Sequence, residues 1–114
     1  MGMDNDLWAR KGNESIHLAD WRKHYKLDQI VGDNHVREMS SYIEAEKYEP
    51  DPWNGARIFL SIENIESIIK AYESGELVDG WGNREKGKTT DAEVFLYAKE
   101  LIKQGYTIWY MACY

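Results

Sequence analysis

The sequence predicts an α+β domain in which helices pack on one face of a small, mainly antiparallel sheet. Residues 15–20 alternate apolar and polar side chains with a period of two, as a half-buried strand does. Residues 61–75 carry an apolar stripe at helical spacing, and residues 106–114 are rich in β-branched and aromatic side chains. Because the chain has 114 residues, we expect one domain over residues 1–114 with one core.

The chain is predicted to begin with a β-hairpin. Its strands are residues 6–10 and 15–20, because Lys11-Gly12-Asn13-Glu14 between them has the composition of a turn. Asp20 is a suitable N-cap for a first helix, which Gly32 is expected to end.

A second helix is predicted over residues 35–48, where charged residues lie opposite a loose apolar stripe. Two prolines and an Asn-Gly pair make residues 49–55 an exposed connection. Residues 57–60 are a short strand of β-forming residues. Ser61 is the N-cap of the amphipathic third helix, and Gly75 ends it.

Residues 79–89 are predicted to form a Gly-rich polar loop before the last helix. Thr90 and Glu93 have capping-box spacing, so the Thr90 hydroxyl should accept the Glu93 N–H while the Glu93 carboxylate reaches back. Gly105 closes that helix. The strand over residues 106–114 is apolar on both faces, so we place it centrally in the sheet. The predicted order is β-β-α-α-β-α-α-β.

Composition excludes several classes of protein. Fourteen Lys and Arg against twenty Asp and Glu give a net charge of −6, which makes nucleic-acid binding an unfavourable hypothesis. No apolar run is long enough to span a membrane, and the first residues lack the features of a secretory signal. The single cysteine, Cys113, excludes an internal disulfide and favours a reducing, cytoplasmic location.

Little in the sequence indicates catalysis. The histidines, His17, His24 and His35, include no His-x-x-x-His pair, so we expect no metal and no cofactor. Cys113 lies in an apolar strand, where a free cysteine usually behaves as a small hydrophobe. No nucleophile or acid–base pair can be identified. We therefore assign no catalytic residue and favour a protein that is not an enzyme.

The loop does contain the spacing of a Walker A motif, Gly82-x-x-x-x-Gly87-Lys88-Thr89. However, the preceding Glu76-Leu77-Val78-Asp79 is a poor candidate for the buried parallel strand that positions such a loop, and the chain is short for an NTPase core. Two interpretations stay open. The loop and its cations hold a small anion, or the loop is solvated and binds nothing.

Trp21-Arg22-Lys23-His24-Tyr25 is the second concentration of cationic and aromatic groups. Guanidinium and indole groups together suit a planar anion or the carboxylate of a partner. In the alternative interpretation, Trp21 and Tyr25 are core residues and Arg22 forms an ion pair that holds a helix. The candidate ligand-binding residues of the two segments are Trp21, Arg22, Lys23, Trp81, Arg84, Lys86 and Lys88.

The same run carries a resemblance to a protein family. Together with the Met1-Gly2-Met3-Asp4 start and the aromatic C-terminal strand, Trp21-Arg22-Lys23 resembles small proteins of tailed phages and prophages. Those proteins begin Met-Gly-Leu-Asp and carry Tyr-Trp-Arg-Lys, so Asp20 stands where they have Tyr, and Gly80-Trp81-Gly82 matches their aromatic Gly-rich loop only loosely. The resemblance implies a viral accessory protein in a bacterial cytoplasm and supplies no catalytic residues.

Two functions remain open on this basis. The first is a non-enzymatic accessory protein that binds a partner protein, or itself, through exposed aromatic residues. Five Trp and eight Tyr in so short a chain favour it. The second is a binder of a small anionic ligand, such as a nucleotide, placed between Trp21-Arg22-Lys23 and the loop at Gly80–Lys88.

Overall fold

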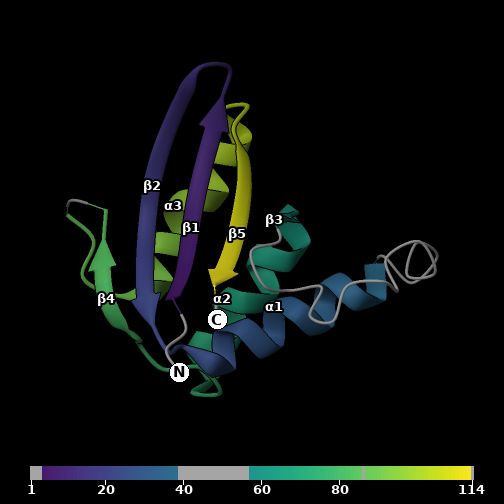
Figure 1. Cartoon of the computed structure of the whole chain (residues 1–114), viewed down its shortest axis with the longest axis vertical. Coiled ribbons are helices and arrows are strands. Elements are labelled where there is room, and N and C mark those ends of the chain that lie inside the picture. The colour runs from purple at the N-terminus through teal and green to yellow at the C-terminus, as the bar shows by residue number, and fades with distance from the viewer. Residues whose placement is uncertain (1–3, 39–56, 86, 114) are drawn as a thin grey trace.

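The computed structural model describes residues 4–38, 57–85 and 87–113, and these residues form a five-stranded antiparallel sheet with three helices (Figure 1). The strand order across the sheet is β3-β5-β1-β2-β4. The elements in chain order are β1 (Asp4–Lys11), β2 (Glu14–Arg22), α1 (Tyr25–Glu38), β3 (Arg57–Leu60), α2 (Ile62–Ser74), β4 (Trp81–Arg84), α3 (Asp91–Lys103) and β5 (Thr107–Cys113). The predicted α+β class is confirmed.

The N-terminal hairpin is longer than predicted and has the predicted turn. β1 and β2 pair antiparallel along their whole lengths. Gly12 in the turn has a φ of 59°, a left-handed conformation that glycine adopts without the steric cost of a Cβ. Because β2 continues to Arg22, Asp20 is a strand residue and not the helix N-cap that the sequence suggested.

The first helix also runs further than predicted. α1 passes through Gly32 and ends at Glu38. An internal glycine costs only about 1 kcal/mol relative to alanine, and the buried Leu27 and Val31, one turn apart, hold the helix against the core. Of the second helix predicted over residues 35–48, the first part belongs to α1 and the rest lies outside the described residues.

The caps of the other two helices follow the prediction. The Ser61 hydroxyl accepts the backbone N–H of Asn64, and Gly75 ends α2 in the left-handed conformation with a φ of 86°. At α3 the Thr90 hydroxyl accepts the Glu93 N–H at 3.2 Å. The Glu93 carboxylate reaches back to Thr90 as predicted, and it accepts the hydroxyls of Thr90 and of its neighbour Thr89.

The Gly-rich segment differs from the predicted loop, because residues 81–84 form the edge strand β4. β4 pairs with β2, with Gly82 opposite Trp21. A Cβ on Gly82 would lie 1.9 Å from the backbone oxygen of Asp20, so only glycine allows the two strands to approach this closely. The composition of the segment indicates a turn, so the sequence does not predict this close approach of the two strands.

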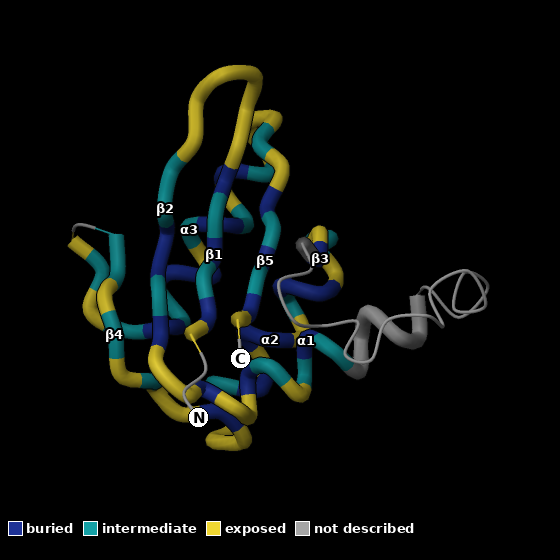
Figure 2. The backbone as a smooth tube through the Cα atoms, in the orientation of Figure 1, coloured by how far each residue is buried: buried dark blue, intermediate teal, exposed yellow. Residues whose placement is uncertain are grey.

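Helices α2 and α3 cover one face of the sheet, and α1 runs beside α2 at the lower end of the sheet (Figure 1). β1 and β5 alternate buried and less buried residues along their lengths, as the alternating colours of Figure 2 show. Their buried residues join α2 and α3 in a core whose largest fully buried side chains include Trp21, Tyr110 and Phe95. β5 lies between β3 and β1, which confirms that it is not an edge strand.

Candidate functional site

The sheet face turned away from the helices, called the open face below, carries the side chains that alternate with the buried ones. Leu7 and Ala9 of β1 are buried, for example, while Trp8 between them is only partly covered. The strand register places the following side chains on this face: Asp6, Trp8, Arg10, His17, Asp20, Arg22, Phe59, Trp81, Asn83, Thr107, Trp109 and Met111.

Four rings lie in register across this face, from β3 through β5 and β1 to β2. Phe59 lies opposite Trp109, Trp109 opposite Trp8, and Trp8 opposite His17. The Trp8 and Trp109 rings are stacked, with centroids 5.6 Å apart and planes 10° apart. The Trp8 and His17 rings are 4.5 Å apart. We call Phe59, Trp109, Trp8 and His17 the aromatic row.

A β-bulge places Asp20 on the open face. The register shifts between Leu7, which pairs with Ala19, and Trp8, which pairs with His17. Leu18 is therefore the extra residue, and its side chain is buried in the core. If the register set by the turn continued beyond Trp8 and His17, Ala19 would lie opposite Asp6, so the bulge exchanges a methyl group for the Asp20 carboxylate on the open face.

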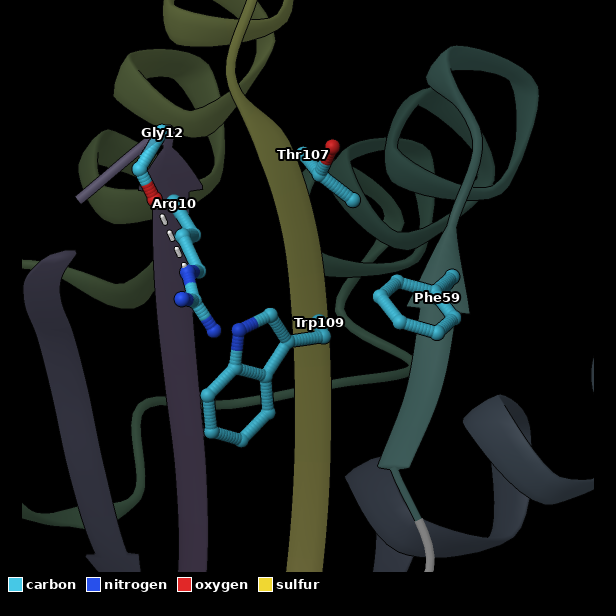
Figure 3. Close-up of a pocket in the computed structure, with 5 residues that line it drawn as sticks. All are labelled: Arg10, Gly12, Phe59, Thr107 and Trp109. Carbon is cyan, nitrogen blue, oxygen red and sulfur yellow. Dashed lines mark hydrogen bonds between the residues drawn. The ribbon is translucent and has the colours of Figure 1, made fainter. Parts of the chain in front are cut away.

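A shallow hollow of about 240 Å³ lies at the β3 end of the row (Figure 3). Its lining residues are Arg10, Gly12, Phe59, Thr107 and Trp109. Phe59 has 59% of its surface exposed although it is a large apolar residue. Arg10 donates its Nε to the Gly12 carbonyl at 3.1 Å and forms no ion pair within the described part of the chain. The hollow thus combines two aromatic rings with an unpaired positive charge.

Acidic side chains form the next row of the open face. Asp6 lies directly opposite Asp20, which lies opposite Asn83. His17 Nε2 is 3.0 Å from Asp6 Oδ1. Asp20 Oδ1 accepts the backbone N–H of Asn83 at 3.2 Å and its side-chain amide at 3.3 Å. The acidic row is therefore held by hydrogen bonds along the sheet.

Two of the predicted ligand-binding residues, Trp21 and Arg84, instead hold a buried carboxylate. Trp21 is 1% exposed, which confirms the alternative interpretation of this residue as core. Asp91, at the start of α3, is fully buried. Its carboxylate accepts hydrogen bonds from Trp21 Nε1 at 2.8 Å, Arg84 Nε at 2.8 Å, the Gly80 N–H at 2.8 Å and the Tyr72 hydroxyl at 2.9 Å. Neither Trp21 nor Arg84 is thus available to a ligand.

This network keeps Asp91 ionised. Burial alone would raise the pKa of the Asp91 carboxyl, but the hydrogen bonds that it accepts outweigh this effect and lower the pKa to about 2. Arg84 Nη2, 2.7 Å away, balances the charge. Burial and the neighbouring Asp91 raise the pKa of the Tyr72 hydroxyl well above its usual value. Because every donor is used within the protein, the cluster has a structural role and joins β2, β4, α2 and α3.

Another predicted pair does come together on the surface. Arg22 and Trp81 lie opposite each other at the ends of β2 and β4, with the Arg22 guanidinium 5.9 Å from the Trp81 ring centroid. Both side chains are exposed, and so is that of Lys23, whose φ of 56° is unusual for a residue with a Cβ. Tyr25, which the alternative interpretation placed in the core, is 53% exposed.

The start of the helix that follows the Gly-rich segment is capped from within the protein. The N–H of Asp91 at the start of α3 donates to the Asp79 carboxylate at 2.9 Å, and Thr90 caps the same helix end. Lys88 lies over the Tyr97 ring at 4.7 Å. Lys86 lies outside the described residues. Asp79 thus already places a carboxylate at the helix end where an anion would bind, which disfavours the Walker-like interpretation.

The sequence prediction missed Trp8, Trp109 and Phe59. For Trp8 the sequence did contain an indication, because side chains alternate along a strand and Trp8 must therefore lie on the other face of the sheet from Leu7. In β5 the signal was absent, because residues on both faces of the strand are apolar and aromatic. Which of them face the helices depends on the pairing with β1, a contact between chain ends about 100 residues apart in sequence.

Searches against protein-family models, curated proteins and solved structures found no match to this chain. The phage and prophage resemblance therefore stays a prediction. Within the described residues, none of the helices has the length and apolar character needed to cross a bilayer.

Proposed function

We propose that this chain is a non-enzymatic binding module whose open face receives a partner protein, with a partner side chain inserted into the hollow beside Phe59 and Trp109. The observation that carries the proposal is the aromatic row. Aromatic residues gathered on one rigid surface are typical of binding hot spots, and in this row Phe59 is exposed while Trp8 and Trp109 are half-buried.

The size of the hollow supports a protein partner over a nucleotide. Sites for small molecules and cofactors usually enclose about 300–1,000 Å³, whereas this hollow measures about 240 Å³ and is lined by five residues. That volume suits one inserted side chain. The surrounding flat row then offers further contact area to the rest of a partner surface, which a free nucleotide would leave uncovered.

Charge at the hollow defines the chemistry of the partner. Arg10 has no ion pair among the described residues, while Asp6 and Asp20 of the neighbouring row already have partners. A partner segment that places an aromatic or aliphatic side chain next to a carboxylate would satisfy both the rings and the guanidinium. The resemblance and the lone cysteine favour a bacterial cytoplasm as the place of this interaction.

Selection from a randomised peptide library tests the proposal without knowledge of the partner. Peptides that bind the wild-type protein should pair an apolar or aromatic residue with an acidic one. Phe59→Ala and Arg10→Ala should each weaken them about tenfold or more. Leu96→Ala is the matched control. Leu96 is also a large apolar residue with 49% of its surface exposed, but it belongs to helix α3, away from the open face. Selected peptides that bind Phe59→Ala and Leu96→Ala equally well would contradict the proposal.

The anionic-ligand alternative has a separate test. A thermal-shift screen of the purified protein against nucleotides and phosphosugars should give no shift, since Arg84 is paired with Asp91 and Lys88 lies over the Tyr97 ring. At about 100 times its dissociation constant, a true ligand adds roughly 2.7 kcal/mol of stability and raises the unfolding midpoint by several degrees. A shift that Arg22→Ala and Lys88→Ala both abolish would restore the alternative.

A further inference from the structure

The open face also brings together three side chains of the kinds that bind metal ions. The ligand atoms of Asp6, His17 and Asp20 all lie within 4.8 Å of one another. We infer that these residues form a site for a divalent first-row transition-metal ion, with the remaining coordination positions open toward the surface. This inference does not depend on the proposed partner.

The spacing of the donors fits such an ion. Two ligands that each lie about 2.1 Å from a metal, at tetrahedral or right angles, are roughly 3.0–3.4 Å apart. His17 Nε2 and Asp6 Oδ1 are already 3.0 Å apart. Asp20 supplies the third donor, whose ligand atom lies within 4.8 Å of the other two. Both His17 and Asp6 are partly accessible, with 36% and 26% of their side chains exposed, so an ion can reach them.

The charge arrangement requires a positive partner. Asp6 and Asp20 are direct register partners on adjacent antiparallel strands, a position in which two like charges destabilise a sheet. Among the described residues, no Lys or Arg forms an ion pair with either carboxylate. A divalent cation between them would convert this repulsion into attraction, whereas the histidine alone supplies at most one charge when it is protonated.

Neighbouring groups hold these ligands in place. The backbone and side-chain amides of Asn83 orient Asp20, and the Trp8 ring packs against His17. The β-bulge matters as well, since the unbroken register from the turn would place Asp20 opposite Asn5 on the covered face. One imidazole with two carboxylates favours Zn²⁺, Mn²⁺ or Fe²⁺ over Mg²⁺ and Ca²⁺, which take oxygen ligands.

Titration of the untagged, chelator-treated full chain with Zn²⁺ tests the inference. Calorimetry should show one ion bound per chain. Asp6→Asn, Asp20→Asn and His17→Gln should each weaken binding about tenfold or more. Asp4→Asn is the control, because Asp4 is an exposed carboxylate two residues away on the same strand.

A second measurement needs no variant. Added Mn²⁺ should broaden the backbone amide signals of residues 6, 17 and 20 in the wild-type protein before it broadens those of other residues. Absence of Zn²⁺ binding would overturn the inference. So would binding that the three substitutions leave unchanged, or Mn²⁺ broadening centred elsewhere.

Discussion

Trp8 of β1 and Trp109 of β5 are direct register partners, and their rings stack in nearly parallel planes at the centre of the open face. Their positions are 101 residues apart in the sequence, so only the completed sheet brings them together. The pair connects folding to the proposed function, because the surface offered to a partner exists only after the C-terminal strand has joined the N-terminal hairpin.

The stacked pair predicts a spectroscopic signal. Two parallel indoles at this separation couple their electronic transitions and should give a paired positive and negative band in the circular dichroism spectrum. Trp8→Phe and Trp109→Phe should each remove the band while leaving the fold intact. Trp81→Phe should leave it in place, since Trp81 lies at the far edge of the sheet beside Arg22. A band that survives either of the first two substitutions would contradict the stacking.

Loss of the buried carboxylate should be costly. Asp91→Ala leaves the largely buried Arg84 without its counter-charge and several donors without an acceptor, and removal of one partner from such a pair typically costs about 3–5 kcal/mol of unfolding free energy. Glu66→Ala is the comparison, because the Glu66–Lys99 ion pair is partly exposed and should contribute less than about 1 kcal/mol. Urea denaturation measures both. Equal losses in the two variants would refute the assigned role of Asp91.

The same carboxylate predicts a dependence on pH. The pKa of Asp91 is lowered in the folded protein from 3.8 to about 2, so its ionised form stabilises the fold above its unfolded pKa. That contribution, on the order of 2 kcal/mol, should be lost as the pH falls from about 4 to about 2. Asp91→Asn should be less stable at neutral pH and should show a shallower decline over this interval. Identical slopes for both proteins would show that Asp91 does not carry the effect.

The contact between β2 and β4 depends on a glycine. Gly82→Ala places a methyl group against the Asp20 backbone, so we expect β4 to move away from β2 and the unfolding free energy to fall by about 2 kcal/mol or more. Amide hydrogen exchange should rise at Glu85, whose N–H donates to the Leu18 carbonyl at 2.7 Å. Unchanged exchange at Glu85 would mean that the strands tolerate the methyl group.

Local sequence signals predicted those parts of the fold that local physics determines. The hairpin turn at Gly12 and the caps at Ser61, Gly75 and Thr90 were all visible as short motifs. Helix α1 continued through Gly32 because burial of neighbouring side chains outweighed a weak local preference. Tertiary packing therefore determines where helix α1 ends, and tertiary packing cannot be seen in a single sequence.

The candidate site was harder to predict for the same reason. Trp21 and Arg84 belong to cationic and aromatic clusters in sequence, yet both turn inward to Asp91, a partner that sequence spacing does not reveal. The aromatic row depends on the order of strands, and Asp20 reaches the open face beside Asp6 only through a one-residue bulge. Such a shift in register reverses which face a side chain occupies and leaves no mark on composition.

The measurement that tests the central claim most directly is an NMR titration of the tryptophan indole N–H signals with a peptide recovered by the selection. The open-face account predicts that the signals of Trp8 and Trp109 shift or broaden as the peptide is added. The signal of Trp21, which is buried and hydrogen-bonded to Asp91, should stay in place. Unmoved Trp8 and Trp109 signals in a protein saturated with peptide would show that the partner binds elsewhere.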